Sequence, residues 1–494
     1  YVSSVDLAGA TTKPISFDGY NKLTLVDAGA NAVSNVTLGA TKYDMGSAST
    51  FYIKDTGTYD LEMSGSNVFA LSSNVVGALA TELEWKATED QILYSSDAAA
   101  SDHFGWTISI SGDYAIVGAP YEDTGGANGG AVYIYKRDST TGVWGSEQKI
   151  LASDKQASDQ FGYSVSMDGD YAIVGARYED TGGSQAGAAY MYKRDPSTGV
   201  WGSEQKIQAS DKQAVDFFGE SVSLSGDYAI VGAVNDDVGS SDTNHGAAYI
   251  YTRNASTGVW GSEQKIQASD IQAADYYGRS VSISGAGYAI VGVPDKDTYT
   301  GAAYIYTRNA STGVWGDEQK IEASDKASND NFGKSVSLSG DYAIVGAYAE
   351  DTGGAEAGAA YIYVRSGTTW SEQQKIQSSD IQAGDMFGES VSINSNYAIV
   401  GAWRKNSNIG AVYIFERSGT TWTEVKKITA SDAQADDNFG YSVAIDGTTV
   451  FVGARDEDTK SSDAGAVYIF EKSAKAVPSL TFDGNNKLTV SNFN

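Results

Sequence analysis

The sequence predicts an all-β protein built around a seven-bladed β-propeller, and three observations support this. A unit with the pattern Asp-x4-Asp-x-Phe-Gly, with Tyr once replacing Phe, recurs seven times at spacings of 52 to 59 residues. Each unit contains four short strand-like runs and no helical periodicity. The last unit lacks its fourth run, and a matching run precedes the first unit, as expected when a ring of blades closes on itself.

Residues 1–80 contain no copy of the unit. Short alternating runs at 22–25, 51–54 and 59–63 are separated by glycine-containing breaks, including Asp18-Gly19, which suits a hairpin turn. This pattern predicts a small β-rich, sandwich-like domain ahead of the propeller.

Residues 81–473 form the predicted propeller. In the second copy the expected strands are A at 163–167, B at 171–175, C at 188–192 and D at 201–207. Strand B is nearly continuous apolar, as in a strand covered on both faces. The run Trp85 to Leu93 resembles the D strand at 144–150, so we expect the segment 82–93 to complete the last blade and to remove the open edges of the ring.

Residues 474–494 repeat a motif of the N-terminal domain. Phe482-Asp483-Gly484 and the five residues after it match the segment that begins Phe17-Asp18-Gly19 at seven of eight positions. These six residues are our candidates for an assembly contact. The segment could pair within its own chain, supply a strand to another copy, or begin a further domain.

Composition narrows the classes of partner. The net charge of −29 opposes binding to nucleic acid, the chain has no cysteine, and no apolar run is long enough to span a membrane. The charge suits a soluble extracellular protein or one that meets divalent cations. The start at Tyr1 suggests a processed chain or a fragment whose leader is missing.

The motif Phe161-Gly162, followed by Gly175-Ala176 and Gly187-Ala-Ala-Tyr190, resembles the FG-GAP repeats of integrin α-subunit heads and many secreted microbial proteins. The resemblance implies a seven-bladed propeller and an extracellular location. It also implies a calcium loop of the Asp-x-Asp-x-Asp-Gly type between strands A and B. Here that loop is reduced to Asp168-Gly-Asp170, which has too few carboxylates, so the resemblance does not extend to that site.

A different acidic feature is expected at one rim of the propeller, because the D–A and B–C loops lie at the same end of the strands. The D–A loops carry paired aspartates, which we interpret as caps of backbone N–H groups. The B–C loops carry acidic pairs that are candidate calcium ligands, although calcium is not required for the fold: Glu122-Asp123, Glu179-Asp180, Asp236-Asp237, Glu350-Asp351 and Glu457-Asp458. The opposite rim receives Lys136, Lys193 and a series of arginines, which predicts one acidic and one comparatively basic face.

The positions of the tryptophans and histidines separate packing residues from candidate contact residues and argue against a His-based catalytic site. The D-strand tryptophans recur in every unit and are expected to pack between blades, whereas Trp106 and Trp403 lie outside that register and are candidates for a contact surface. The only histidines, His103 and His245, occupy non-equivalent loops, so no His-based catalytic site is predicted.

The resulting expectation is a non-enzymatic extracellular protein with a structural or assembly role in a surface layer, filament or virion. Its main partner would be itself, through head-to-tail stacking or strand exchange. The alternative is an adhesion or ligand-binding propeller that recognises glycans, surface proteins or cations. A lyase or hydrolase acting through the divergent sixth blade is the remaining class.

Overall fold

The computed structural model describes residues 83–124, 126–237 and 243–473, together with the backbone of eight strands in the flanking segments. The chain divides into two compact units, Tyr1–Trp85 with Lys472–Asn494, and Lys86–Glu471. Asp18, Gly19, Asp483 and Gly484 lie outside the described residues, so their predicted role in assembly stays a prediction.

The first unit contains two sheets. Three strands form one sheet in the order β1-β2-β5, and five form the other in the order β36-β37-β6-β3-β4. The strands are β1 (Ile15–Phe17), β2 (Lys22–Leu25), β3 (Val33–Leu38), β4 (Thr41–Asp44), β5 (Thr50–Tyr52), β6 (Gly57–Met63), β36 (Ser479–Phe482) and β37 (Lys487–Ser491). The C-terminal β37 pairs antiparallel with β6 of the same chain, with Leu488 opposite Tyr59.

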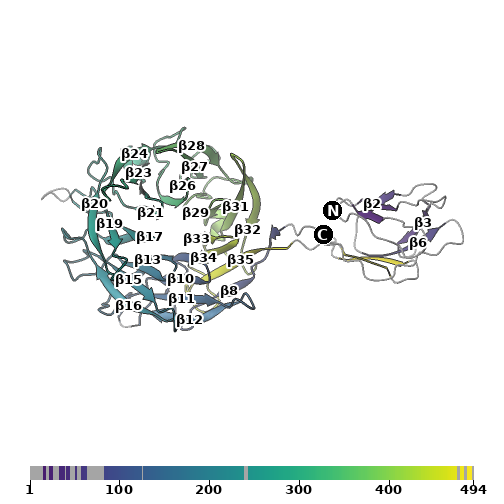
Figure 1. The fold of residues 1–494 in the computed structure, drawn as a ribbon, viewed down its shortest axis with the longest axis horizontal. Coiled ribbons are helices and arrows are strands. Elements are labelled where there is room, and N and C mark those ends of the chain that lie inside the picture. The colour runs from purple at the N-terminus through teal and green to yellow at the C-terminus, as the bar shows by residue number, and fades with distance from the viewer. Residues whose placement is uncertain are drawn as a thin grey trace. The chain divides into compact units, whose positions relative to one another are not determined.

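The second unit is a ring of seven antiparallel blades around a central channel (Figure 1). Blades one to three comprise β9 (Thr107–Ser111), β10 (Tyr114–Ala119), β11 (Ala131–Arg137) and β12 (Trp144–Ile150); β13 (Phe161–Asp168), β14 (Tyr171–Ala176), β15 (Ala188–Arg194) and β16 (Trp201–Ile207); and β17 (Phe218–Ser225), β18 (Tyr228–Ala233), β19 (Ala247–Arg253) and β20 (Trp260–Ile266). Blades four to six comprise β21 (Ser280–Ser284), β22 (Tyr288–Val293), β23 (Ala302–Arg308) and β24 (Trp315–Ile321); β25 (Ser335–Ser339), β26 (Tyr342–Ala347), β27 (Ala359–Ser366) and β28 (Thr369–Ile376); and β29 (Ser390–Ile393), β30 (Tyr397–Ala402), β31 (Ala411–Ser418) and β32 (Thr421–Ile428).

The seventh blade uses strands from both ends of the propeller sequence. It consists of β33 (Phe439–Asp446), β34 (Thr449–Ala454) and β35 (Ala466–Ala474), with β7 (Leu83–Trp85) and β8 (Gln91–Leu93) pairing antiparallel to β35. In this pairing Leu93 lies opposite Val467 and Ile92 opposite Tyr468. The early segment therefore occupies the outer-strand position of this blade.

Repeated polar contacts join neighbouring blades at six of the seven junctions. The Gln148 side chain donates to the Trp201 carbonyl at 2.7 Å and accepts from the Trp201 N–H at 2.9 Å, so it pairs with the backbone of the next blade as a strand would. The same contact recurs from Gln91, Gln205, Gln264, Gln319 and Gln374. As predicted, the D-strand tryptophans are buried, with exposed fractions between 2% and 5%.

The Phe-Gly motif has a packing explanation. Phe161 is fully buried, and Gly162 adopts a φ of +91°, which disfavours residues with a side chain. A Cβ at Gly162 would lie 2.5 Å from the Ala131 carbonyl oxygen of the preceding blade. The motif thus lets the inner strand of one blade approach the backbone of its neighbour.

Two four-residue helical segments were not predicted. They are α1 (Lys296–Tyr299) and α2 (Lys405–Asn408), which replace the acidic B–C loop in blades four and six. The two central residues of each segment have a positive φ, 52° and then 62°, so neither segment is a regular right-handed helix. The sequence predicted a divergent B–C loop in the sixth blade, and the structure shows that the fourth blade has the same kind of loop.

Candidate functional site: the mouth of the central channel

The paired aspartates of the D–A loops act within the fold. The second aspartate of each pair accepts a hydrogen bond from the backbone N–H three residues earlier, as Asp159 does from Gln156 at 2.7 Å. This confirms the predicted cap, which recurs at Asp102, Asp216, Asp275, Asp330, Asp385 and Asp437. Burial raises the pKa of Asp216 to about 7, although the hydrogen bond from Gln213 opposes the shift.

The first aspartate of each pair binds groups of the following blade. Asp154 accepts from the Tyr190 hydroxyl at 2.8 Å and from Lys206 Nζ at 2.7 Å. Burial alone would raise the pKa of Asp154, but the hydrogen bonds from Lys206 and Tyr190 lower it below its usual range.

The acidic B–C loops expected to bind calcium meet a lysine instead. Glu179 is fully buried, and its Oε1 lies 2.8 Å from Lys206 Nζ, so one ammonium group lies between Asp154 and Glu179. Lys149 pairs with Glu122, Lys265 with Asp236 and Lys375 with Glu350 in the same way. In these four blades one ammonium group therefore lies against the first acidic residue of the pair, and calcium binding by these loops stays a prediction.

The second acidic residue of each loop caps a turn. Asp123 accepts from the Asn128 N–H, and Asp180, Asp237, Asp351 and Asp458 make equivalent bonds. Within the described ranges, no group of three or more His, Asp or Glu side chains is placed to hold a metal ion.

Basic side chains at the opposite rim are largely engaged within the chain. Arg194, Arg253 and Arg365 form ion pairs with Asp170, Asp227 and Asp341 of the A–B turns. Lys136 and Lys193 lie over the rings of Tyr114 and Tyr171. These contacts reduce the charge that this rim offers to a partner.

The central channel is lined by one position whose residue type differs among the seven blades. A cavity of about 290 Å³ is lined by three consecutive residues from each inner strand. The second residue is always Ser or Thr, and its hydroxyl donates to a glycine carbonyl of the next blade, as Ser164 does to Gly219 at 2.8 Å. The third is always Val or Ile. The first residue varies and defines what we call the channel mouth: Trp106, Tyr163, Glu220, Arg279, Lys334, Glu389 and Tyr441.

One sector of the channel mouth is aromatic. The Trp106 ring lies 5.2 Å from Tyr441 and 5.5 Å from Tyr163, measured between ring centroids. Tyr121 adds an edge contact at 5.4 Å, and Trp403 lies 6.1 Å from Tyr441. Trp106 and Trp403, which the sequence separated from the packing tryptophans, thus belong to one aromatic cluster.

Guanidinium groups lie against these rings. The Arg177 guanidinium carbon is 3.6 Å from the Tyr163 centroid, and that of Arg455 is 3.8 Å from Tyr441 and 4.7 Å from Trp106. His103 Nδ1 lies 2.7 Å from Asp456 Oδ1, which places His103 beside this cluster as well. Burial raises the pKa of Tyr441 to about 12, although Arg455 opposes the shift, so its hydroxyl stays protonated near neutral pH.

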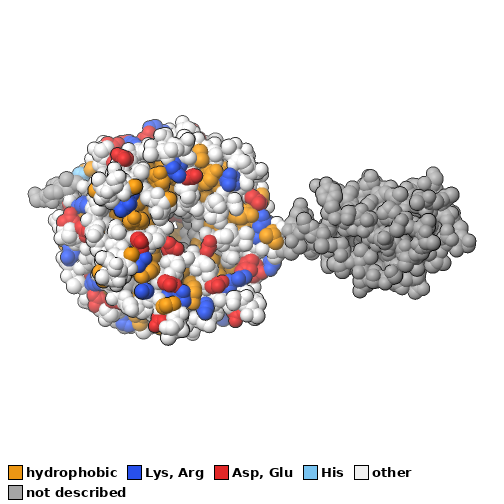
Figure 2. All heavy atoms as spheres, in the orientation of Figure 1, with side chains coloured by type: hydrophobic (Ala, Val, Ile, Leu, Met, Phe, Trp, Pro, Cys, Tyr) orange, Lys and Arg blue, Asp and Glu red, His pale blue; other side chains and the backbone are white. Residues whose placement is uncertain are grey.

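The remaining sector of the channel mouth carries charges of both signs. Glu220 is buried and binds Arg279 at 2.6 Å and Arg177 at 3.1 Å, while Lys334 binds Glu389 at 3.1 Å. Two acids and two bases among the seven residues give no net charge, in contrast to the chain as a whole. Acidic, basic and hydrophobic side chains are also interspersed around the central hollow in Figure 2.

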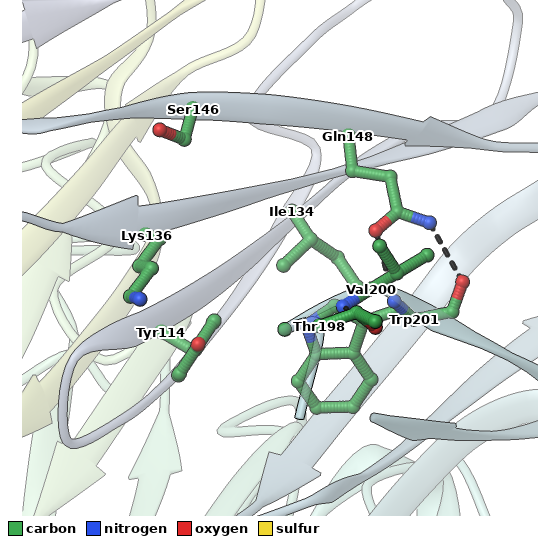
Figure 3. Close-up of a pocket in the computed structure, with 9 residues that line it drawn as sticks. Tyr114, Ile134, Lys136, Ser146, Gln148, Thr198, Val200 and Trp201 are labelled. Carbon is green, nitrogen blue, oxygen red and sulfur yellow. Dashed lines mark hydrogen bonds between the residues drawn. The ribbon is translucent and has the colours of Figure 1, made fainter. Parts of the chain in front are cut away.

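A second cavity, of about 550 Å³, lies between blades one and two (Figure 3). Its lining includes Tyr114, Gln148 and Trp201, with the Gln148–Trp201 hydrogen bond along one side. These residue types recur between other blades, so this cavity is part of the repeated packing and does not distinguish one blade from another.

Sequence reasoning missed most of the channel mouth. The signal was available, because the residue after each Phe-Gly differs among copies whose neighbouring positions are alike. Only knowledge of the ring, however, shows that seven residues about 55 positions apart surround one opening.

Among solved structures the chain is similar to the Pan2 WD40 domain of Neurospora crassa, with 9% identity, 80% of this chain and 97% of that chain covered, and a TM-score of 0.43. It is also similar to Sqt1 of Saccharomyces cerevisiae, with 10% identity, 78% and 100% covered, and a TM-score of 0.39. No curated protein is a significant match.

Among the residues that the structure describes, no helix has the length and apolar character needed to cross a membrane.

The FG-GAP repeat model matches seven segments of the chain, which together make up more than half of it: 87–135, 144–192, 201–251, 260–306, 315–363, 370–415 and 422–470. Seven matched repeats and seven observed blades coincide, and the chain therefore belongs to the FG-GAP repeat family.

Proposed function

We propose that this chain is a non-enzymatic, extracellular ligand-binding or adhesion propeller, and that its ligand docks at the channel mouth. FG-GAP repeats are typical of extracellular proteins, and the family is generally non-catalytic. The location is supported by a contrast among the residues that line the channel. The second and third residues of each set keep their type in all seven blades, whereas the first varies and is aromatic in three of them: Trp106, Tyr163 and Tyr441.

The ligand class that fits best is an uncharged glycan. Arg177 and Arg455 lie against the Tyr163, Tyr441 and Trp106 rings, so a sugar ring would pack on the parts of these half-buried rings that the guanidinium groups leave uncovered. Arg455, Asp456 and His103 offer hydrogen-bonding groups beside them. The balanced charge of the channel mouth gives no attraction to a cationic partner. A volume of about 290 Å³ is near the lower limit for ligand pockets, about 300 Å³, and suits one sugar unit at the end of a chain.

Self-assembly, our first expectation from the sequence, gains no further support. The basic groups of the opposite rim are paired within the chain, and β37 pairs with β6 of its own chain. Both contacts occupy groups that an assembly would use, so we place this role second.

A glycan array tests the proposal. We expect wild type to bind a subset of neutral oligosaccharides, and Trp106→Ala to weaken that binding by more than tenfold. Val200→Ala, an exposed position in the C–D turn, should bind as wild type does. Absence of glycan binding by the wild type, or equal binding by Trp106→Ala, would contradict the proposal.

A further inference from the structure

The seventh blade departs from the charge pattern of the other six. In those blades a D-strand lysine donates to the first aspartate of the D–A pair, at Nζ to Oδ2 distances between 2.5 and 3.0 Å. These lysines are Lys149, Lys206, Lys265, Lys320, Lys375 and Lys427. In the seventh blade the register places Ile92 at this position, opposite Tyr468 as Lys149 lies opposite Tyr133.

The carboxylates of the seventh blade are nevertheless retained. Asp432 accepts from the Tyr468 hydroxyl at 2.8 Å, like its equivalents in the other blades. Glu457 is 1% exposed, and its Oε1 accepts from the Thr459 N–H at 2.9 Å, as Glu179 does from Thr181 at 2.8 Å. Both carboxylates thus keep their positions although the lysine between them is missing.

Glu457 Oε2 is buried and has no hydrogen-bond partner. In blades two and five the equivalent oxygen accepts from Gln208 or Gln377, at 2.9 and 3.0 Å. Glu122 Oε2 in blade one also has no partner, but Lys149 binds the other oxygen of that carboxylate, whereas Glu457 Oε1 has no lysine. The residue at that position in the seventh blade is Tyr94. Among the described residues Glu457 thus has one hydrogen-bond donor, the Thr459 N–H, and no cation, and a buried carboxylate without a positive partner is strongly unfavourable.

We propose that the seventh blade binds a divalent cation between Asp432 and Glu457, at the position of the lysine ammonium in the other blades. In the second blade one Nζ lies 2.7 Å from Asp154 and 2.8 Å from Glu179, so this arrangement brings two carboxylates to one positive centre. Oxygen ligands select hard cations, and Ca²⁺ or Mg²⁺ held by two carboxylates completes its coordination with water. Asp432 is only half-buried, which leaves room for that water.

The other groups near this position are acidic or neutral, with one exception. Asp437 and Asp458 add negative charge, and burial together with the charges of Glu457, Asp432 and Asp458 raises the pKa of Asp437 to about 6, against the opposing hydrogen bond from Gln434. Lys460 is the exception; its Nζ lies 4.7 Å from the Tyr94 ring centroid. A Lys460 side chain that turned from the Tyr94 ring toward Glu457 would supply the positive charge in place of a divalent cation.

Thermal unfolding of the full chain tests the proposal, after dialysis against EDTA and addition of CaCl₂ or MgCl₂, with KCl at matched ionic strength as control. We expect either divalent salt to raise the Tm of the wild type by about 2 °C or more, and KCl to have no such effect. Ile92→Lys should unfold at a higher temperature in EDTA and lose the response. Ile92→Met, similar in length but uncharged, should keep it.

Two further variants distinguish the sources of charge. Glu457→Gln should abolish the divalent response without lowering the Tm in EDTA, because it removes the buried charge. Lys460→Met should leave the response intact. The proposal is overturned if the wild type does not respond, if Ile92→Lys responds like the wild type, or if Lys460→Met alone lowers the Tm in EDTA.

Discussion

Replacement of Lys206 by methionine is the perturbation whose cost follows most directly from the structure. The Lys206 ammonium lies between Asp154 and Glu179, and the Glu179 side chain is fully buried. Breaking a buried ion pair by removing one partner costs about 3–5 kcal/mol. Glu179 keeps its hydrogen bonds from Thr181 and Gln208, so we expect the lower end of that range, about 3 kcal/mol.

The buried charge left behind is the source of this cost, so removing it should restore stability. We expect Lys206→Met with Glu179→Gln to lose only about 1 kcal/mol, which is about 2 kcal/mol less than Lys206→Met alone. The coupling energy in the double-mutant cycle is this difference plus the cost of Glu179→Gln alone. The assay is urea unfolding followed by tryptophan fluorescence, with all four proteins at the same pH and salt concentration.

Lys193→Met provides the matched control. Lys193 lies over the Tyr171 ring at the opposite rim, so its loss should change the unfolding free energy by less than about 1 kcal/mol. The reasoning is refuted if Lys206→Met is no more damaging than Lys193→Met, or if Glu179→Gln does not rescue it.

Three more predictions concern pH and packing. The raised pKa of Asp216 means that its native state binds a proton more tightly than its unfolded state, so its contribution to stability is fully present below pH 4 and is lost as pH rises through about 7. Asp216→Asn should therefore gain stability relative to wild type between pH 5 and pH 8, by at most about 4 kcal/mol, in paired urea titrations; an unchanged difference would contradict this. Gly162→Ala should cost more than about 3 kcal/mol because its Cβ would meet the Ala131 carbonyl, whereas Gly169→Ala, with open space around it, should cost about 1 kcal/mol; calorimetry that finds equal losses would remove the packing explanation. Gln148→Ala should lower the Tm and speed hydrogen exchange at the Trp201 N–H, which the Gln148 side chain otherwise protects; unchanged exchange would show that this link is not needed.

Much of the propeller was predictable because each blade repeats its own local signals. The runs from Tyr171 to Ala176 and from Trp201 to Ile207 identify strands by periodicity, and their recurrence counts the blades. The interpretation as a cap was correct for the second aspartate of each pair, and for a local reason, since Asp159 accepts from an N–H only three residues away. The first aspartate, as at Asp154, binds side chains of the following blade.

The candidate site was less predictable because its contacts join distant residues. Lys206 meets Asp154 and Glu179 only once the strands pair, so the sequence suggested calcium ligands where the structure has an ion pair. Trp106 and Tyr441 are far apart in sequence and become neighbours only when the ring brings the first and last blades together.

Tryptophan fluorescence tests the proposed binding site most directly. The seven D-strand tryptophans are 2–5% exposed, so of the nine tryptophans in the chain only Trp106 and Trp403 belong to the cluster at the channel mouth. A neutral oligosaccharide that binds there should shift the wild-type emission in a saturable way, and Trp106→Phe should abolish most of that shift while Trp422→Phe retains it. A saturable shift that persists when Trp106 and Trp403 are both replaced by Phe would place the ligand elsewhere and contradict the assignment of the channel mouth.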